Sequence, residues 1–201
     1  SLQTYTVPTP AGPLQVLAVP WPRRSAILSR DESRGLSIEE VRREMERRMT
    51  SAVESRARQL DPDVPAIQAG HVTVNGATVG TERSMMLGQD HVLLVSALDR
   101  PQVDYVALGH VHKHQVLRAG LPGPLVAYSG SLQRVDFSEE ADEKGFCVVD
   151  LDPSAPQGHR LVDFKFEPLE ARPFVTIEAS VAPGEVAPTA AVLGAIARKN
   201  V

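Results

Sequence analysis

Three histidines of this chain have the side-chain type and the spacing that a metal site requires. His110 and His112 are one residue apart, and His71 lies earlier in the chain. On an extended backbone, alternate residues point to the same side, so His110 and His112 share one side and Val111 takes the other. Imidazole is the commonest side-chain ligand of transition metals. These residues predict a metal site, and such a site would perform hydrolytic chemistry on phosphoesters or related substrates.

The predicted strands place these histidines where ligands usually bind. The apolar residues 105–108 precede His110, and residues 66–70 lead directly into His71. In an open α/β sheet, ligands collect at the ends of the strands. We therefore predict that His71, His110 and His112 bind metal. The alternative is that they are ordinary core or surface histidines.

The sequence offers few further ligands beyond these three histidines. His114 continues the alternation beyond His112 and is a candidate fourth ligand, but Lys113 indicates that the strand has left the sheet there. We therefore expect His114 at the rim of the site, facing solvent or a substrate phosphate. No carboxylate takes a comparable place, because Asp104 precedes its strand. Three imidazoles alone resemble a zinc site with an open position, whereas two-metal phosphate-hydrolysing sites add bridging carboxylates.

The elements that position these residues follow from hydrophobic periodicity and from turn residues. A capping box at Ser37 and Glu40 opens a long amphipathic helix over residues 37–60, with a Glu/Arg-rich outer face that we expect to be solvated. Trp21, between two prolines, is expected to pack in a tight loop, with a binding role as the alternative. Residues 72–82 are expected to form a loop and residues 190–197 a helix. Strands are expected at residues 13–19, 66–70, 91–95, 104–109, 115–118, 124–128, 145–151, 161–166 and 174–177.

The composition is that of a globular chain with a core of its own. Its 201 residues are 42% hydrophobic and 23% charged, with a net charge of −4. This charge gives no argument for a nucleic-acid partner, and it excludes none, because metal ions can supply local positive charge. Cys147 is the only cysteine, so no intrachain disulfide forms, which fits a reducing cytoplasm. No apolar run approaches the ~18 residues of a transmembrane helix.

Several motifs of the chain resemble those of one enzyme family. Residues 104–112, which end in Gly-His-Val-His, resemble the last motif of the calcineurin-like metallophosphoesterases. The Tyr-Ser-Gly-Ser of residues 128–131 and the Arg-Val-Asp-Phe of residues 134–137, followed by an acidic turn, resemble more specifically the SbcD-type DNA repair exonucleases. Residues 71–77 and 80–83 resemble the preceding histidine motif of that family. The resemblance runs from about residue 60 to residue 150.

The resemblance implies a fold and a ligand assignment. Residues 1–171 would be the C-terminal portion of a four-layer α/β/β/α metallophosphoesterase sandwich, an α/β fold. Residues 172–201, beyond a shift in composition, would begin a truncated α+β capping domain. The family binds two metal ions, usually Mn²⁺. By motif position, His71 and His110 would bind one ion and His112 the other, and Ser131 and Arg134 would line the substrate rim or, equally, stabilise their loop.

The implied activity is metal-assisted hydrolysis of DNA phosphodiesters in double-strand-break repair or recombination. The implied partners are DNA, an SbcC-like ATPase subunit and a second copy in a homodimer, all in the cytoplasm and without a membrane. The family's Asp-x-His, Gly-Asp-x-x-Asp and Gly-Asn-His motifs do not occur in this sequence. We therefore expect a C-terminal fragment with little or no nuclease activity. The alternatives are a metallophosphoesterase acting on small phosphodiesters or nucleotides, and a non-catalytic binding or assembly module.

Overall fold

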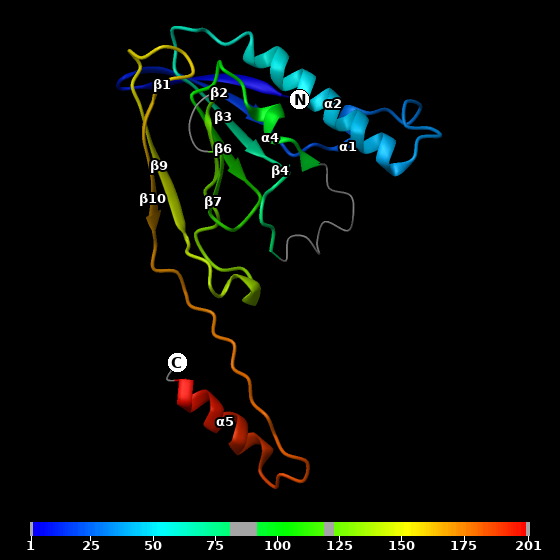
Figure 1. Ribbon diagram of the computed structural model, residues 1–201, viewed down its shortest axis with the longest axis vertical. Helices are drawn as coiled ribbons and strands as arrows, with labels where there is room; N and C mark the ends of the chain where they lie inside the picture. The colour runs from blue at the N-terminus through cyan, green and yellow to red at the C-terminus, as the bar shows by residue number, and fades with distance from the viewer. Residues whose placement is uncertain (1, 81–91, 119–122, 200–201) are drawn as a thin grey trace.

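A six-stranded mixed sheet forms the centre of the computed structural model, which describes residues 2–80, 92–118 and 123–199 (Figure 1). The strand order is β1-β2-β3-β6-β8-β7. The four inner strands run parallel to one another, and the outer strands β1 and β7 are antiparallel to their neighbours. The strands are β1 (Gln3–Thr9), β2 (Gly12–Val19), β3 (Ala66–His71), β6 (Tyr105–Gly109), β7 (Gln115–Arg118) and β8 (Leu125–Tyr128).

Two small sheets and several helices surround this sheet. The long hairpin β9–β10 is antiparallel, and the short strands β4 and β5 pair in parallel. Their bounds are β4 (Thr73–Val74), β5 (Val92–Leu93), β9 (Gly145–Leu151) and β10 (Leu161–Pro168). The helices are α1 (Arg24–Ile27), α2 (Ile38–Ala57), α4 (Val95–Leu98), the 3₁₀-helix η1 (Phe137–Glu139) and α5 (Pro188–Lys199). No helix of the described residues is both long enough and apolar enough to cross a membrane.

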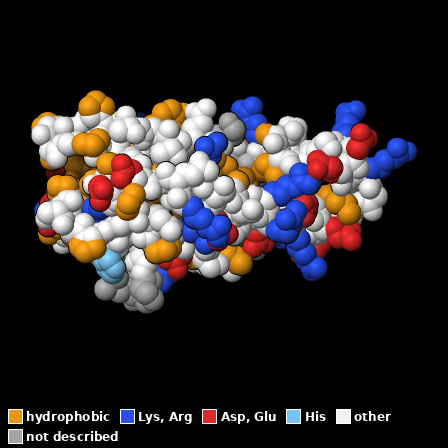
Figure 2. All heavy atoms as spheres, turned by 90° about the horizontal axis from the view of Figure 1, so that it is seen from above, with side chains coloured by type: hydrophobic (Ala, Val, Ile, Leu, Met, Phe, Trp, Pro, Cys, Tyr) orange, Lys and Arg blue, Asp and Glu red, His pale blue; other side chains and the backbone are white. Residues whose placement is uncertain are grey.

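Helix α2 confirms the predicted capping box. The Ser37 side chain accepts a hydrogen bond from the Glu40 amide, and the Glu40 carboxylate accepts one from the Ser37 amide at 2.8 Å. The outer face carries alternating charges in ion pairs, such as Arg43 with Glu39 and Arg47 with Glu44. Figure 2 shows the Lys and Arg side chains at this end of the molecule interspersed with Asp and Glu. This solvated face was expected. The inner face buries Val41, Met45, Met49, Val53 and Ala57.

The main core lies between α2 and one face of the sheet. Met49 and Val53 of α2 belong to the same buried cluster as Leu17 of β2, Val106 of β6 and Tyr128 of β8. On the opposite face, the β9–β10 hairpin packs over β6. Tyr105 and Phe164 meet there with their ring centroids 5.9 Å apart. The molecule therefore has helical, sheet and hairpin layers, which confirms the α/β class.

Several predicted elements are wrong or incomplete. The predicted loop 72–82 contains β4, and the predicted strand 91–95 is replaced by the short β5 and the start of α4. Residues 174–177 form no strand, because the Thr176 amide donates to the Glu140 carboxylate and not to a neighbouring strand. Strand β1 was not predicted: Tyr5 and Val7 alternate with threonines there, but every residue of the strand is exposed.

The last part of the chain leaves the sheet. Beyond β10 it runs extended, and α5 lies at the far end of the molecule from the sheet (Figure 1). Within α5, only Ala195 is buried, while Leu193 is 59% exposed. The predicted helix is confirmed, opened by Pro188 at its first position.

Two buried glutamines on the helix-facing side of the sheet differ in their hydrogen bonding, so their substitution is expected to change stability in opposite directions. Gln15 donates to the Asp61 and Val64 carbonyls and accepts from the Asp61 amide. The amide group of Gln68 is fully buried, and among the described residues neither its oxygen nor its nitrogen has a hydrogen-bond partner. An unsatisfied buried polar group costs about 1–3 kcal/mol.

We expect Gln68→Met to raise the free energy of unfolding by about 1–3 kcal/mol, because it removes that cost while nearly keeping the volume. We expect Gln15→Met to lower it by a similar amount, because the backbone groups that it satisfies lose their partner. Chemical denaturation with urea measures both. A destabilised Gln68→Met variant would contradict this account of the core.

Candidate metal centre

The ends of three parallel strands meet at one edge of the sheet. The register pairs Val19 with Gly70 and His71 with Gly109, so β2, β3 and β6 end side by side. Trp21 follows β2, His71 is the last residue of β3, and His110 follows β6. This is the carboxyl edge, where open α/β sheets bind ligands. A hollow of about 450 Å³ opens here, and its lining includes His71 and Gly109.

Trp21, His71 and His110 form one cluster of rings. The ring centroids of His71 and His110 are 5.1 Å apart. The Trp21 ring lies 4.6 Å from that of His110 and 6.0 Å from that of His71. The structure therefore brings two of the three predicted ligands together. The sequence predicts Trp21 as a packing residue, with a binding role as the alternative. It does not predict the contact of Trp21 with both histidines, although Trp21 follows a strand that ends at this edge.

His110 reaches the cluster through an unusual backbone. Its φ is +97°, the only positive φ of a non-glycine residue among the described residues. Such a conformation costs of order 1–3 kcal/mol and persists only where the surroundings impose it. Residues held in this way gather at functional sites. The backbone thus turns sharply where β6 delivers its histidine.

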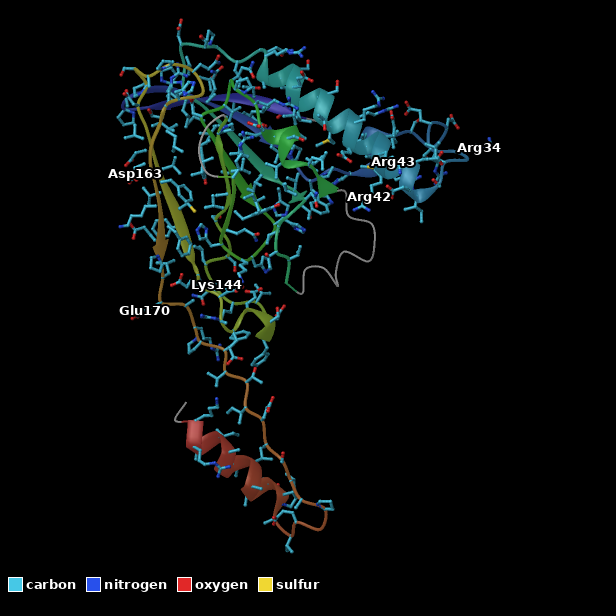
Figure 3. All side chains as sticks on the ribbon, viewed as in Figure 1. Arg34, Arg42, Arg43, Lys144, Asp163 and Glu170 are labelled. Atoms are coloured by element: carbon cyan, nitrogen blue, oxygen red, sulfur yellow. The ribbon has the colours of Figure 1, made fainter. Side chains whose placement is uncertain are left out.

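His112 belongs to a second cluster. Its Nδ1 lies 2.9 Å from Oε1 of Glu139, which is buried in η1. Oε2 of Glu139 lies 2.7 Å from Nζ of Lys144, whose side chain has no exposed surface. Lys144 stands just before β9, beside the loop that carries η1 (Figure 3). Sequence reasoning missed Glu139 and Lys144, because nothing in the local pattern pairs residues so far apart.

The charge of Glu139 is stabilised by its neighbours. Burial raises the pKa of this carboxyl, but hydrogen bonds from Lys144, His112 and the Val135 amide outweigh burial, so the net pKa lies below its ordinary value. The carboxylate is therefore ionised at neutral pH. Lys144 also donates to Ser131 Oγ at 3.1 Å.

The predicted rim residues take different places. His114 does not face outward: its ring stacks on Phe166 with centroids 4.0 Å apart, and its Nδ1 lies 2.8 Å from the Tyr128 carbonyl oxygen. The Arg134 guanidinium donates to backbone carbonyls of the loop around η1 and of the segment after β10, including those of Glu139 and Asp142. These contacts support the loop-stabilising alternative for Arg134, and its contact with substrate stays a prediction.

The donor set of a metal ion is present in part. His71 and His110 supply two neighbouring imidazoles, the donors that Zn²⁺ and Mn²⁺ accept. Within residues 2–80, 92–118 and 123–199, no group of three His, Cys, Asp or Glu side chains is arranged to hold an ion. The described residues therefore fit one side of a metal site and do not complete its ligand shell.

Comparison with known proteins agrees with the motifs. No protein-family model matches the chain. It is similar to the SbcD component of the nuclease SbcCD of Rhodobacter capsulatus, with 32% identity over 107 residues, which are 52% of this chain and 25% of that protein. It is also similar to the SbcD component of the same nuclease of Staphylococcus epidermidis, with 29% identity over 126 residues, 61% of this chain and 30% of the relative. The resemblance to SbcD-type nucleases is thus confirmed, over less than a third of the length of these relatives.

The buried ion pair predicts how the loop around η1 responds to substitution. Lys144→Met leaves the Glu139 carboxylate buried without its counter-charge, and we expect the free energy of unfolding to fall by about 3–5 kcal/mol. The matched control is Lys113→Met, which removes an exposed lysine 3.5 Å from Asp142 and is expected to cost at most ~1 kcal/mol. Urea denaturation compares the two. Equal losses would show that the Lys144 pair is not the stabilising contact.

Proposed function

We propose that this chain is the C-terminal part of the catalytic domain of an SbcD-type, metal-dependent DNA nuclease. The observation that carries the proposal is the pair His71 and His110, which lie 5.1 Å apart at the carboxyl edge of parallel strands, inside motifs that resemble that family. In the intact protein, the function is hydrolysis of DNA phosphodiesters in double-strand-break repair or recombination. Its partners are DNA, an SbcC-like ATPase and a second copy, in the cytoplasm.

In this proposal the histidines are divided between two ions. His71 and His110 hold one Mn²⁺, and His112 holds the other. When bound, such ions polarise a phosphoryl oxygen and activate a water molecule. The work of this chain is to place the three imidazoles, with Ser131 and Arg134 near the rim.

The domain boundaries belong to the same proposal. Residues 1–171 form part of a four-layer sandwich, and residues 172–201 begin a capping domain. The three observed layers are compatible with this arrangement, and the extended path of residues 169–187 fits a connection between two domains. The bridging carboxylates come from elsewhere in the intact protein, so this chain by itself lacks nuclease activity.

The only tryptophan of the chain makes the first ion directly testable, because Trp21 contacts both of its proposed ligands. Titration with paramagnetic Mn²⁺ should quench Trp21 fluorescence saturably, and EDTA should reverse the effect. We expect His71→Ala and His110→Asn to lose the quenching; Asn is chosen because it tolerates a positive φ. The control His159→Ala, in an exposed turn, should keep it. Quenching that survives both ligand substitutions would overturn the assignment.

A nuclease assay tests the division of the active site between this chain and the rest of the protein. With Mn²⁺ and single-stranded DNA, we expect no turnover above that of the His110→Asn variant. Robust turnover that His110→Asn abolishes would show that the chain contains a complete site. Such a result would contradict the expected inactivity of the chain while supporting its identity as a nuclease.

A further inference from the structure

A buried carboxylate lies directly behind His112. We propose that Glu139 is a positioning residue: it fixes the His112 imidazole with its proton on Nδ1 and thereby directs metal coordination to Nε2. The metal part of this inference rests on the proposed function, in which His112 binds an ion. The part that concerns the proton stands on the contacts of Glu139 alone.

Both oxygens of Glu139 are engaged, and their partners differ. Oε1 lies 2.9 Å from His112 Nδ1. Oε2 lies 2.7 Å from Lys144 Nζ and accepts from the Val135 amide at 3.1 Å. The Glu139 side chain is 3% exposed and that of Lys144 is 0% exposed. The carboxylate is therefore held in one orientation, with the cation on one side and the imidazole on the other.

This arrangement determines which ring nitrogen carries the proton. A carboxylate paired with an ammonium group accepts hydrogen bonds and donates none. His112 must therefore donate from Nδ1, and in a neutral imidazole the lone pair then sits on Nε2. Histidines that bind metals generally donate their other nitrogen to a carboxylate or a carbonyl in this way, which orients the ring and raises its basicity.

The same ion pair also fixes the backbone of His112. Lys144 Nζ lies 3.2 Å from the His112 carbonyl oxygen, so one ammonium group contacts both Glu139 and the main chain of the histidine. Arg134 secures the other side by donating to the Glu139 carbonyl at 3.1 Å. The ring and its backbone are therefore held by one set of groups, as a ligand that must keep its direction requires.

The isosteric variant Glu139→Gln gives a sharp test, because it should reverse the proton position. The carboxamide oxygen will face the Lys144 ammonium and the Val135 amide, since its NH₂ group would be repelled there. The NH₂ group then faces His112 Nδ1, which has to accept, so the proton moves to Nε2. The matched control is Glu140→Gln, because the Glu140 carboxylate accepts hydrogen bonds from Thr176.

Nuclear magnetic resonance of the ¹⁵N-labelled chain observes the two forms directly. Long-range ¹H–¹⁵N correlations of the histidine rings, recorded near pH 8 and above the usual histidine pKa of about 6.5, distinguish Nδ1–H from Nε2–H. The signals that disappear in His112→Gln identify the residue. We expect Nδ1–H in the wild type and in Glu140→Gln, and Nε2–H in Glu139→Gln. An Nε2–H or doubly protonated His112 in the wild type overturns the proposal, whether or not the variants fold.

A metal titration separates positioning from a general structural role. Titration with diamagnetic Zn²⁺ should shift the His112 Nε2 resonance in the wild type, and Glu139→Gln should need about 10–100-fold more metal for the same shift. Quenching of Trp21 by Mn²⁺ reports His71 and His110, and Glu139→Gln should leave it unchanged. If this variant weakens metal binding equally at both ions, the effect is merely structural and the proposal is contradicted. If the wild type shows neither the Zn²⁺-induced shift nor quenching by Mn²⁺, the proposed function fails, and the protonation result still decides the role of Glu139.

Discussion

The parallel register of β2, β3 and β6 is the constraint on which the rest of the site depends. It makes three strands end at one edge, and only for that reason do Trp21, His71 and His110 meet although they are far apart in sequence. The register is itself imposed by the core against α2, because alternate residues of these strands are buried there. A shift of one residue in β3 would bury His71 against the helix and expose the core. The packing that folds the sheet is thus also what assembles the two imidazoles.

Different interactions fix the two parts of the candidate site. His71 and His110 are placed by sheet register and apolar packing, whereas His112 is placed by a buried ion pair within a loop. An ion pair removed from water is strongly destabilising once one partner is lost, so that half tolerates little change in composition. Strand ends, by contrast, keep their positions as long as the core is filled. The site therefore combines a rigid sheet edge with a loop whose geometry depends on Glu139 and Lys144.

Much of this arrangement could be predicted from local sequence patterns. The contacts that were not predicted all depend on tertiary structure. The capping box at Ser37, the helix it opens and the strands leading to His71 and His110 were predicted because periodicity and caps are local features. The pairing of His112 with Glu139, 27 residues away, could not be, since no periodic pattern records it. His114 was expected to face outward, but its ring stacks on Phe166 of β10. This contact depends on how the β9–β10 hairpin packs on the sheet. The order of strands in the sheet, which brings Trp21 to the site, is likewise a tertiary property.

The left-handed backbone of His110 sets folding and ligand binding against each other at a single residue. At a φ of +97°, glycine would relieve a strain of about 1–3 kcal/mol that histidine must bear. Selection for thermal stability alone would therefore favour replacing His110 by glycine. The resulting chain would be more heat-resistant, but it would have lost one proposed metal ligand. Natural proteins often accept such a trade-off where activity requires a strained residue. Histidine at this position thus lowers the stability of the fold, and it supplies a ligand that glycine could not.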